Sequence, residues 1–165
     1  MTKRLLYTTT ALLLPIGIAL ASGPPETKPG LWSVTNQTID NPGSNKQVWP
    51  PMTVCRNHAY DQYVLSLAKS MPGCTTVSES TQGNKYFMDF RCIVVKTVID
   101  SKGTTTFQGD TSAHSESHTT YTPAMDGKTE TIMTSDSKYI GSCPAGMQPG
   151  DIKHANGTIM HGWKH

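Results

Sequence analysis

The hydrophobic and polar positions after residue 28 predict a chain built mainly from β-strands. The run from Gly30 to Ile39 is rich in β-branched residues and ends in the turn sequence Asp-Asn-Pro-Gly at 40–43, which predicts a first strand. A second run covers 46–56. It contains Pro50 and Pro51, whose nitrogens cannot donate to a strand ladder, so its first half should be an edge or a loop.

One segment has the spacing of a helix. Asn57 can cap a helix N-terminus, and apolar residues follow it at intervals of three and four: Tyr60, Tyr63, Val64, Leu67 and Ala68. The sequence Met-Pro-Gly at 71–73 then ends the helix.

After Cys74 the pattern changes to the period of two that is typical of strands. The runs 75–81 and 85–100 predict a hairpin around a turn at 82–84, and a turn at 101–103 leads to further strands at 104–114, 117–122 and 128–140. The predicted fold class is mainly β, a curved antiparallel sheet or partly closed barrel in meander order, with one short helix and two disulfides. Residues 144–165 read as an extended C-terminal tail.

The N-terminal segment has the pattern of a secretory signal peptide. Lys3 and Arg4 precede a short apolar run, which leads to the small-x-small exit Ala19-Leu20-Ala21. A permanent membrane anchor needs about 20 uninterrupted apolar residues, and Pro15 and Gly17 interrupt this run. We therefore predict a signal peptide at 1–21, a single β-rich domain at 22–143 and a tail at 144–165, located in the periplasm or secreted.

The charge balance argues against nucleic acid as a partner. Cleavage after Ala21 removes Lys3 and Arg4, so the fourteen basic residues fall to twelve, equal to the twelve acidic residues. Nucleic-acid binders normally carry a basic stripe for phosphate contacts, and none is visible here.

The four cysteines predict two disulfides. Cys55, Cys74, Cys92 and Cys143 lack tight metal spacing, and an even count in an exported chain is typical of disulfide bonding. Three pairings are possible, and the sequence does not decide among them. We favour Cys55 with Cys74, around the helix, and Cys92 with Cys143, between a central strand and the last strand.

Several short motifs together resemble one family. They are Lys-Pro-Gly-Leu-Trp at 28–32, Pro-Gly-Cys at 72–74, the strand cysteine Cys92 and Tyr-Ile-Gly-Ser-Cys at 139–143. In this combination the chain resembles the domain of unknown function 3617 family, small exported proteins of Gram-negative bacteria. The resemblance implies a periplasmic, disulfide-bearing β domain. It implies no catalytic residues.

The sharpest candidate for chemistry is His114, Glu116 and His118. On a strand these side chains lie on one face, so two imidazoles and a carboxylate would have the donor types of a divalent metal site, for a metal-dependent protein or hydrolase. The alternative is a polar, solvent-facing strand surface, which the intervening serines also predict. No other cofactor is indicated by the sequence.

No nucleophile motif such as Gly-x-Ser-x-Gly stands in the sequence, so we expect binding rather than catalysis. Gly30-Leu31-Trp32 matches the Gly-x-Trp that opens lipocalin-like barrels, although Trp32 also suits a plain core position. The leading hypothesis is a periplasmic binding or envelope-associated module. It would hold an apolar small molecule or an envelope protein on a concave apolar face formed by alternate residues of 85–140. A purely structural role is the remaining alternative.

Overall fold

The computed structural model describes residues 23–162. This part of the chain contains one α-helix, α1 (His58–Lys69), and ten β-strands. The strands are β1 (Gly30–Asn41), β2 (Asn45–Val48), β3 (Met52–Arg56), β4 (Cys74–Gln82), β5 (Lys85–Val94), β6 (Thr97–Gln108), β7 (Ser112–Met125), β8 (Lys128–Gly141), β9 (Ile152–His154) and β10 (Ile159–Met160). The predicted mainly β fold class is confirmed.

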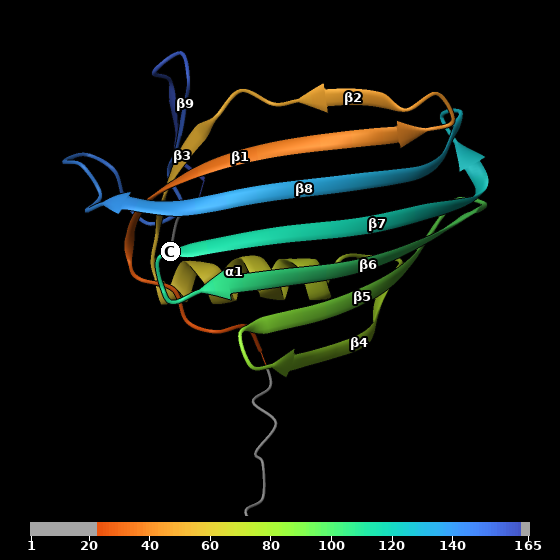
Figure 1. The fold of residues 1–165 in the computed structure, drawn as a ribbon, viewed down its shortest axis with the longest axis horizontal. Helices are drawn as coiled ribbons and strands as arrows, with labels where there is room; N and C mark the ends of the chain where they lie inside the picture. Colours follow the sequence, from red (N-terminus) through yellow and green to blue (C-terminus); the bar gives the residue numbers. More distant parts are fainter. Residues whose placement is uncertain (1–22, 163–165) are drawn as a thin grey trace, which may run out of the picture.

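All strands belong to one antiparallel sheet that does not close into a barrel (Figure 1). Its order is β10-β9-β3-β1-β8-β7-β6-β5-β4, so β4 to β8 form the expected meander and β1 returns to lie beside β8. β2 and β3 pair with successive parts of β1, and Pro50 and Pro51 lie between them outside any strand. The first half of this run is β2, which pairs with β1 alone among the described strands and is therefore an edge, one of the two outcomes that the prolines predict.

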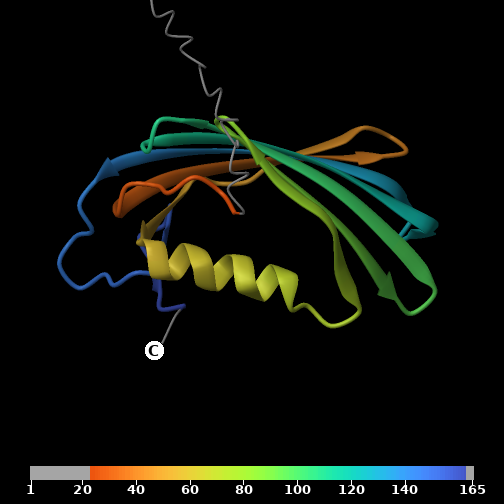
Figure 2. The same cartoon turned by 90° about the horizontal axis from the view of Figure 1, so that it is seen from below.

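The sheet curves over α1, which lies on its concave side (Figure 2). Long strands carry a right-handed twist that accumulates into such a curve, and β-bulges between Leu31 and Trp32 and between Thr76 and Ser78 increase it locally. The helix begins as expected, because the Asn57 side chain caps it by accepting a hydrogen bond from the Tyr60 backbone N–H at 2.8 Å.

Two hairpin turns lie elsewhere than the sequence predicts: they fall at 95–96 and 109–111, not at 101–103 and between the expected strands 104–114 and 117–122. The expected strand 85–100 is broken at Val95 and Lys96, between β5 and β6, and the expected turn at 101–103 lies in the middle of β6. Val95 has a φ of 57°, a left-handed conformation that β-branched residues rarely adopt. A valine at this position therefore gives no sign of a turn in the sequence. Gly103 lies inside β6, and a Cβ on it would make a tight contact of 3.3 Å with the Met88 carbonyl oxygen.

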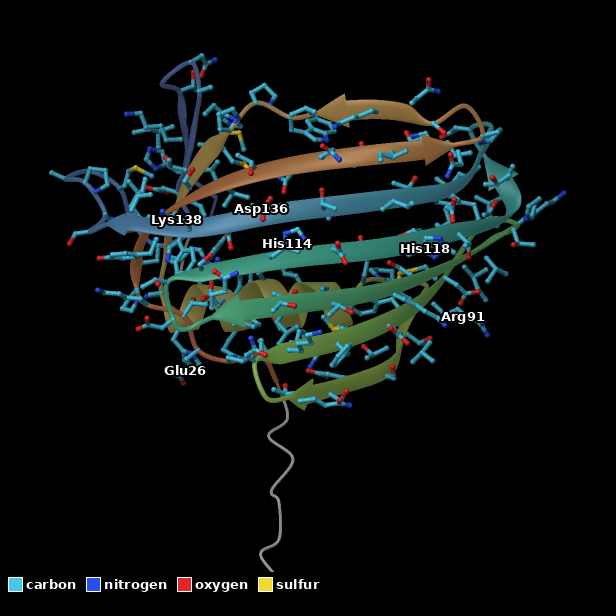
Figure 3. The ribbon with its side chains drawn as sticks, in the orientation of Figure 1. Glu26, Arg91, His114, His118, Asp136 and Lys138 are labelled. Atoms are coloured by element: carbon cyan, nitrogen blue, oxygen red, sulfur yellow. A yellow bond between two sulfur atoms is a disulfide. The ribbon has the colours of Figure 1, made fainter. Side chains whose placement is uncertain are left out.

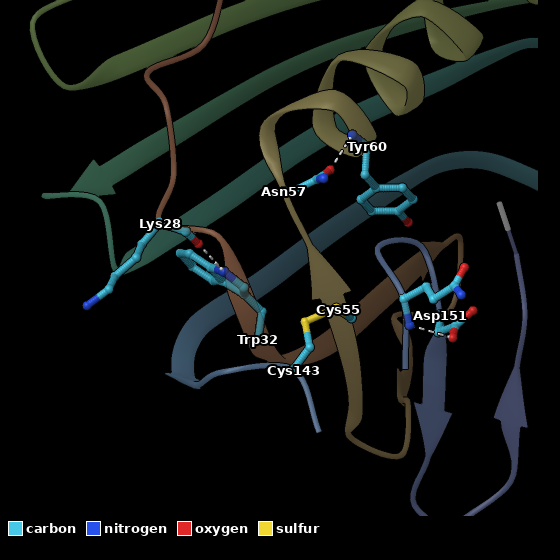
Figure 4. Close-up of a disulfide and its surroundings, with 8 residues drawn as sticks. Lys28, Trp32, Cys55, Asn57, Tyr60, Cys143 and Asp151 are labelled. Carbon is cyan, nitrogen blue, oxygen red and sulfur yellow. Dashed lines mark hydrogen bonds between the residues drawn. A yellow bond between two sulfur atoms is a disulfide. The ribbon is translucent and has the colours of Figure 1, made fainter. Parts of the chain in front are cut away.

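Trp32 is a core residue, fully buried at the end of the sheet (Figure 4). Its indole Nε1 donates to the Lys28 carbonyl at 2.9 Å, and its ring meets the Tyr139 ring edge-on, with centroids 6.1 Å apart. Gly30 has a φ of 142°, and a Cβ on it would approach the Gly141 carbonyl oxygen to 2.4 Å. The opening and closing motifs of the sequence therefore pack against each other, and the missing side chain of Gly30 leaves the space for the Gly141 carbonyl and the Tyr139 ring.

The favoured disulfide pairing is wrong. The bonded pairs are Cys55–Cys143 and Cys74–Cys92. Cys74 and Cys92 are direct register partners on β4 and β5, whereas Cys55 is the penultimate residue of β3 and bonds to the chain that leaves β8. The prediction failed because it assumed that the residues before and after α1 lie close together. The chain after α1 instead crosses to the opposite edge of the sheet.

The C-terminal segment is more ordered than the extended tail we expected. β9 pairs with β3, β10 pairs with β9, and Met147 and Asp151 are buried. Backbone bonds from Cys55 to Asp151 (3.0 Å) and from Gly150 to Cys55 (2.8 Å) fix the segment to the edge of the sheet. Such order depends on tertiary contacts, which the local Pro- and Gly-rich pattern does not reveal.

The predicted signal peptide at 1–21 lies outside the described residues. Within 23–162, no helix combines the length and the apolar character needed to cross a membrane.

Candidate functional site

The concave face of the sheet has two chemically different zones. Near α1 it is apolar: Tyr86, Phe107 and Ala113 form a buried cluster against which Met88 and Leu65 of the helix pack. Further along, the inward positions of β6, β7 and β8 are mostly hydroxyl residues: Ser101, Thr105, Ser115, Ser117, Thr119, Thr131, Ser135 and Ser137. The uniformly apolar concave face that we expected is therefore confined to the part beside α1.

The helix is attached to the sheet at its C-terminal end by a chain of polar contacts. Lys69 forms an ion pair with Glu79 of β4, and Glu79 accepts a 2.8 Å hydrogen bond from the Tyr86 hydroxyl. The lysine holds the pKa of Glu79 below its ordinary value. Burial, with the Glu79 contact, raises the pKa of Tyr86. These three side chains tie α1 to the β4–β5 hairpin.

At the N-terminal end, Asp61 attaches the helix to two segments that precede it in the chain. One carboxylate oxygen accepts from Arg56 Nε at 2.8 Å and the other accepts from the Thr27 hydroxyl at 2.9 Å. The Arg56 guanidinium carbon also lies 4.9 Å from the centroid of the Trp32 ring. Cation–π stacking and the ion pair together hold Arg56 in one orientation.

Between these two attachments a cavity of about 390 Å³ runs beside the helix. Most of its lining is apolar, and Arg56 and Asp61 supply the charged part: Pro24, Val54, Arg56, Tyr60, Asp61, Val64, Leu65, Ala68 and Met88. Burial raises the pKa of Tyr60 in this lining. No residue of α1 is fully buried, which is unusual for a helix that covers a sheet. The helix thus packs on the core through Leu65 and leaves a hollow beside it.

A second, smaller hollow of about 180 Å³ adjoins the first at Met88, which lines both. Its floor carries hydroxyl groups of Ser101, Thr105, Ser115 and Ser117 next to Phe90. We call the two hollows together the helix groove. It can offer apolar contact along α1 and hydrogen bonds from the sheet.

We expect Glu79→Gln to destabilise the protein by about 1 kcal/mol at neutral pH, because it removes a partly buried ion pair. The pKa of Glu79 is lowered in the folded state, so its contribution is present above the unfolded pKa and is lost as the pH falls through the folded pKa. Urea unfolding at several pH values measures this. A difference between wild type and variant that does not shrink as the pH falls below the unfolded pKa of glutamate would contradict the assignment.

His114, Glu116 and His118 lie on the opposite, convex face of the sheet, as Figure 3 shows for the two histidines. His114 Nδ1 lies 2.7 Å from Asp136 Oδ1, its register partner on β8, and Nε2 lies 3.4 Å from Glu116 Oε1. These carboxylates, Asp136 first, raise the pKa of His114. Both ring nitrogens are thus occupied by anions, an arrangement that favours a doubly protonated imidazolium.

His118 does not join this group, because its Nε2 contacts Glu130 of β8. Within residues 23–162, no group of three histidine, cysteine or acidic side chains is placed to hold a metal ion. The structure therefore brings His114 and Glu116 together and adds Asp136, but leaves His118 with another partner. A divalent metal at these residues stays a prediction.

A comparison with models of protein families shows to which family the chain belongs. The model of the protein family of unknown function DUF3617 matches residues 27–143, which include both disulfides and all of the helix groove except Pro24. The chain belongs to the DUF3617 family. No curated protein matches it significantly. In this DUF3617 protein, β9 and β10 lie beyond the matched region.

Sequence reasoning missed the groove and the residues that frame it. Asp61 stands in no motif of the sequence, yet it contacts Arg56 five positions earlier. The positions of Arg56 and Asp61 on either side of the Asn57 cap could have indicated their ion pair, since the first turn of a capped helix lies next to the residues preceding it. No pattern in the neighbouring sequence predicts the contact between Glu79 and Lys69, because it depends on where β4 runs relative to α1.

Proposed function

We propose that this protein is an exported binding module that holds a lipid-like molecule in the helix groove. The observation that carries the proposal is the cavity of about 390 Å³ beside a helix that is attached at both ends and has no fully buried residue. Binding sites for small molecules have volumes of about 300–1,000 Å³ and mainly apolar linings with a few polar groups.

The lining indicates what such a ligand contains. Val64, Leu65 and Met88 would contact an apolar chain. At the end near Trp32, Arg56 uses Nε on Asp61, and a guanidinium has five N–H donors in all, so it can also donate to a carboxylate or carbonyl. The ligand class that fits is an amphipathic molecule with an apolar chain and an acidic or carbonyl head, such as a long-chain fatty acid.

Export to the periplasm or beyond is part of the proposal. Two disulfides are typical of oxidising compartments, and the signal-peptide pattern at 1–21 supports the same location.

The test compares two alanine-to-phenylalanine variants of α1. Ala68 lines the cavity, whereas Ala59 is exposed on the same helix and does not line it. Ala68→Phe places a ring in the groove, so we expect it to bind a fluorescent long-chain fatty acid at least about tenfold more weakly than wild type. Ala59→Phe should bind like wild type.

The binding is measured by fluorescence titration of delipidated protein, and circular dichroism checks that both variants are folded. Equal binding by wild type and Ala68→Phe would contradict the proposal. If none of the three proteins binds the fatty acid, docking of an envelope protein or a structural role replaces it.

A further inference from the structure

A histidine and two methionines meet at the β3–β9–β10 end of the sheet. His154 of β9 is the register partner of Met52 on β3, which places their side chains next to each other on one face. Met160 of β10 pairs with Ile152, two residues before His154 on that same face. Its thioether Sδ lies 3.2 Å from His154 Nε2.

These side chains border open space. A cavity of about 380 Å³ is lined by Met52 and His154 together with Asn36, Trp49, Pro50, Pro51, Ala155 and Asn156. Trp49 and Met160 are about half exposed. An ion from solvent can therefore reach the imidazole and the thioethers, and no carboxylate of residues 23–162 lines this cavity.

The donor set is soft. Thioether sulfur selects Cu(I) among the biological metals, imidazole also suits copper, and the hard cations Mg²⁺ and Ca²⁺ require oxygen ligands. Two atoms that ligate one ion at about 2.0–2.3 Å must lie within about 4.5 Å of each other. The Nε2–Sδ separation of 3.2 Å meets this condition.

We propose that His154, Met160 and Met52 form a binding site for Cu(I), with the exposed Trp49 ring beside it. The site is independent of the helix groove. His154 and Met160 lie beyond the region matched by the family model, so the proposal concerns this chain rather than the family. The ion coordinates the imidazole Nε2 and the two Sδ atoms, and no bond is made or broken in the protein.

The experiment is a competition for Cu(I) between the full-length disulfide-bonded protein and bicinchoninate, in anaerobic ascorbate solution. We expect wild type to withdraw one Cu(I) per chain. His154→Gln, Met160→Leu and Met52→Leu should each weaken the affinity at least about tenfold, since each removes a ligand. Matched controls are Met133→Leu, at a 40% exposed methionine on β8, and His58→Gln on α1.

A second measurement locates the ion without relying on variants. In protein labelled at the methionine methyls, Ag(I), a redox-inert substitute for Cu(I), should shift the NMR signals of Met52 and Met160 and leave Met133 unchanged. The proposal is overturned if wild type withdraws no Cu(I), if the three variants bind like the controls, or if Ag(I) shifts Met133 as strongly as Met160.

Discussion

Replacing Cys55 and Cys143 together by alanine should lower the free energy of unfolding by about 4.5 kcal/mol. The bond closes a loop with a sequence separation of 88, and loop-closure entropy in the unfolded chain grows with the length of the loop. It also joins β3 to the segment that leads to β9. Losing it therefore loosens the end of the sheet where Trp32 and Arg56 lie.

Urea unfolding of the double variant measures this effect, and the Cys74→Ala, Cys92→Ala double variant is its control. The second bond has a sequence separation of only 18, so its loss should cost about 3 kcal/mol. A larger loss from the Cys74–Cys92 variant than from the Cys55–Cys143 variant would contradict the assigned roles.

Trp32→Ala should destabilise the protein by about 3–5 kcal/mol, the range for truncating a buried aromatic side chain. The indole is fully buried, and its removal leaves Tyr139 without its ring contact and Arg56 without its stacking surface. Thermal and urea unfolding, followed by circular dichroism, measure the change.

The matched control is Trp32→Phe, which keeps an aromatic ring but removes the hydrogen bond to the Lys28 carbonyl. We expect Trp32→Phe to destabilise the protein by less than half as much as Trp32→Ala, because one hydrogen bond contributes about 1 kcal/mol and the smaller ring leaves only a partial void. A loss below about 1 kcal/mol for Trp32→Ala would show that Trp32 is not central to the core.

The sequence predicts features that depend on neighbouring residues. The Asn57 cap and the apolar spacing after it locate α1, and the prolines at 50 and 51 indicate an edge or a loop where the edge strand β2 lies. Where a turn uses unusual residues, as at Val95, composition gives the wrong position because the strand pairing, not local preference, sets the backbone. The disulfide pairing fails for the same reason, since it depends on which edges of the sheet meet.

The candidate site is less predictable still. His114 and Glu116 can be placed on one strand face from their spacing, but Asp136 joins them only through the β7–β8 register. The helix groove depends on the distance between α1 and the sheet, and the spacing of apolar residues in the sequence does not predict this distance. The contact between His154 and Met160 arises from a hairpin in a segment that composition marks as a tail.

The most direct test of the central claim is the native mass spectrum of the protein purified without detergent from the periplasm of an expressing bacterium. The expected result is an organic adduct on wild type and on Ala59→Phe, displaced by added fatty acid and absent from Ala68→Phe. Identical spectra for wild type and Ala68→Phe, with or without added fatty acid, would contradict a ligand in the helix groove.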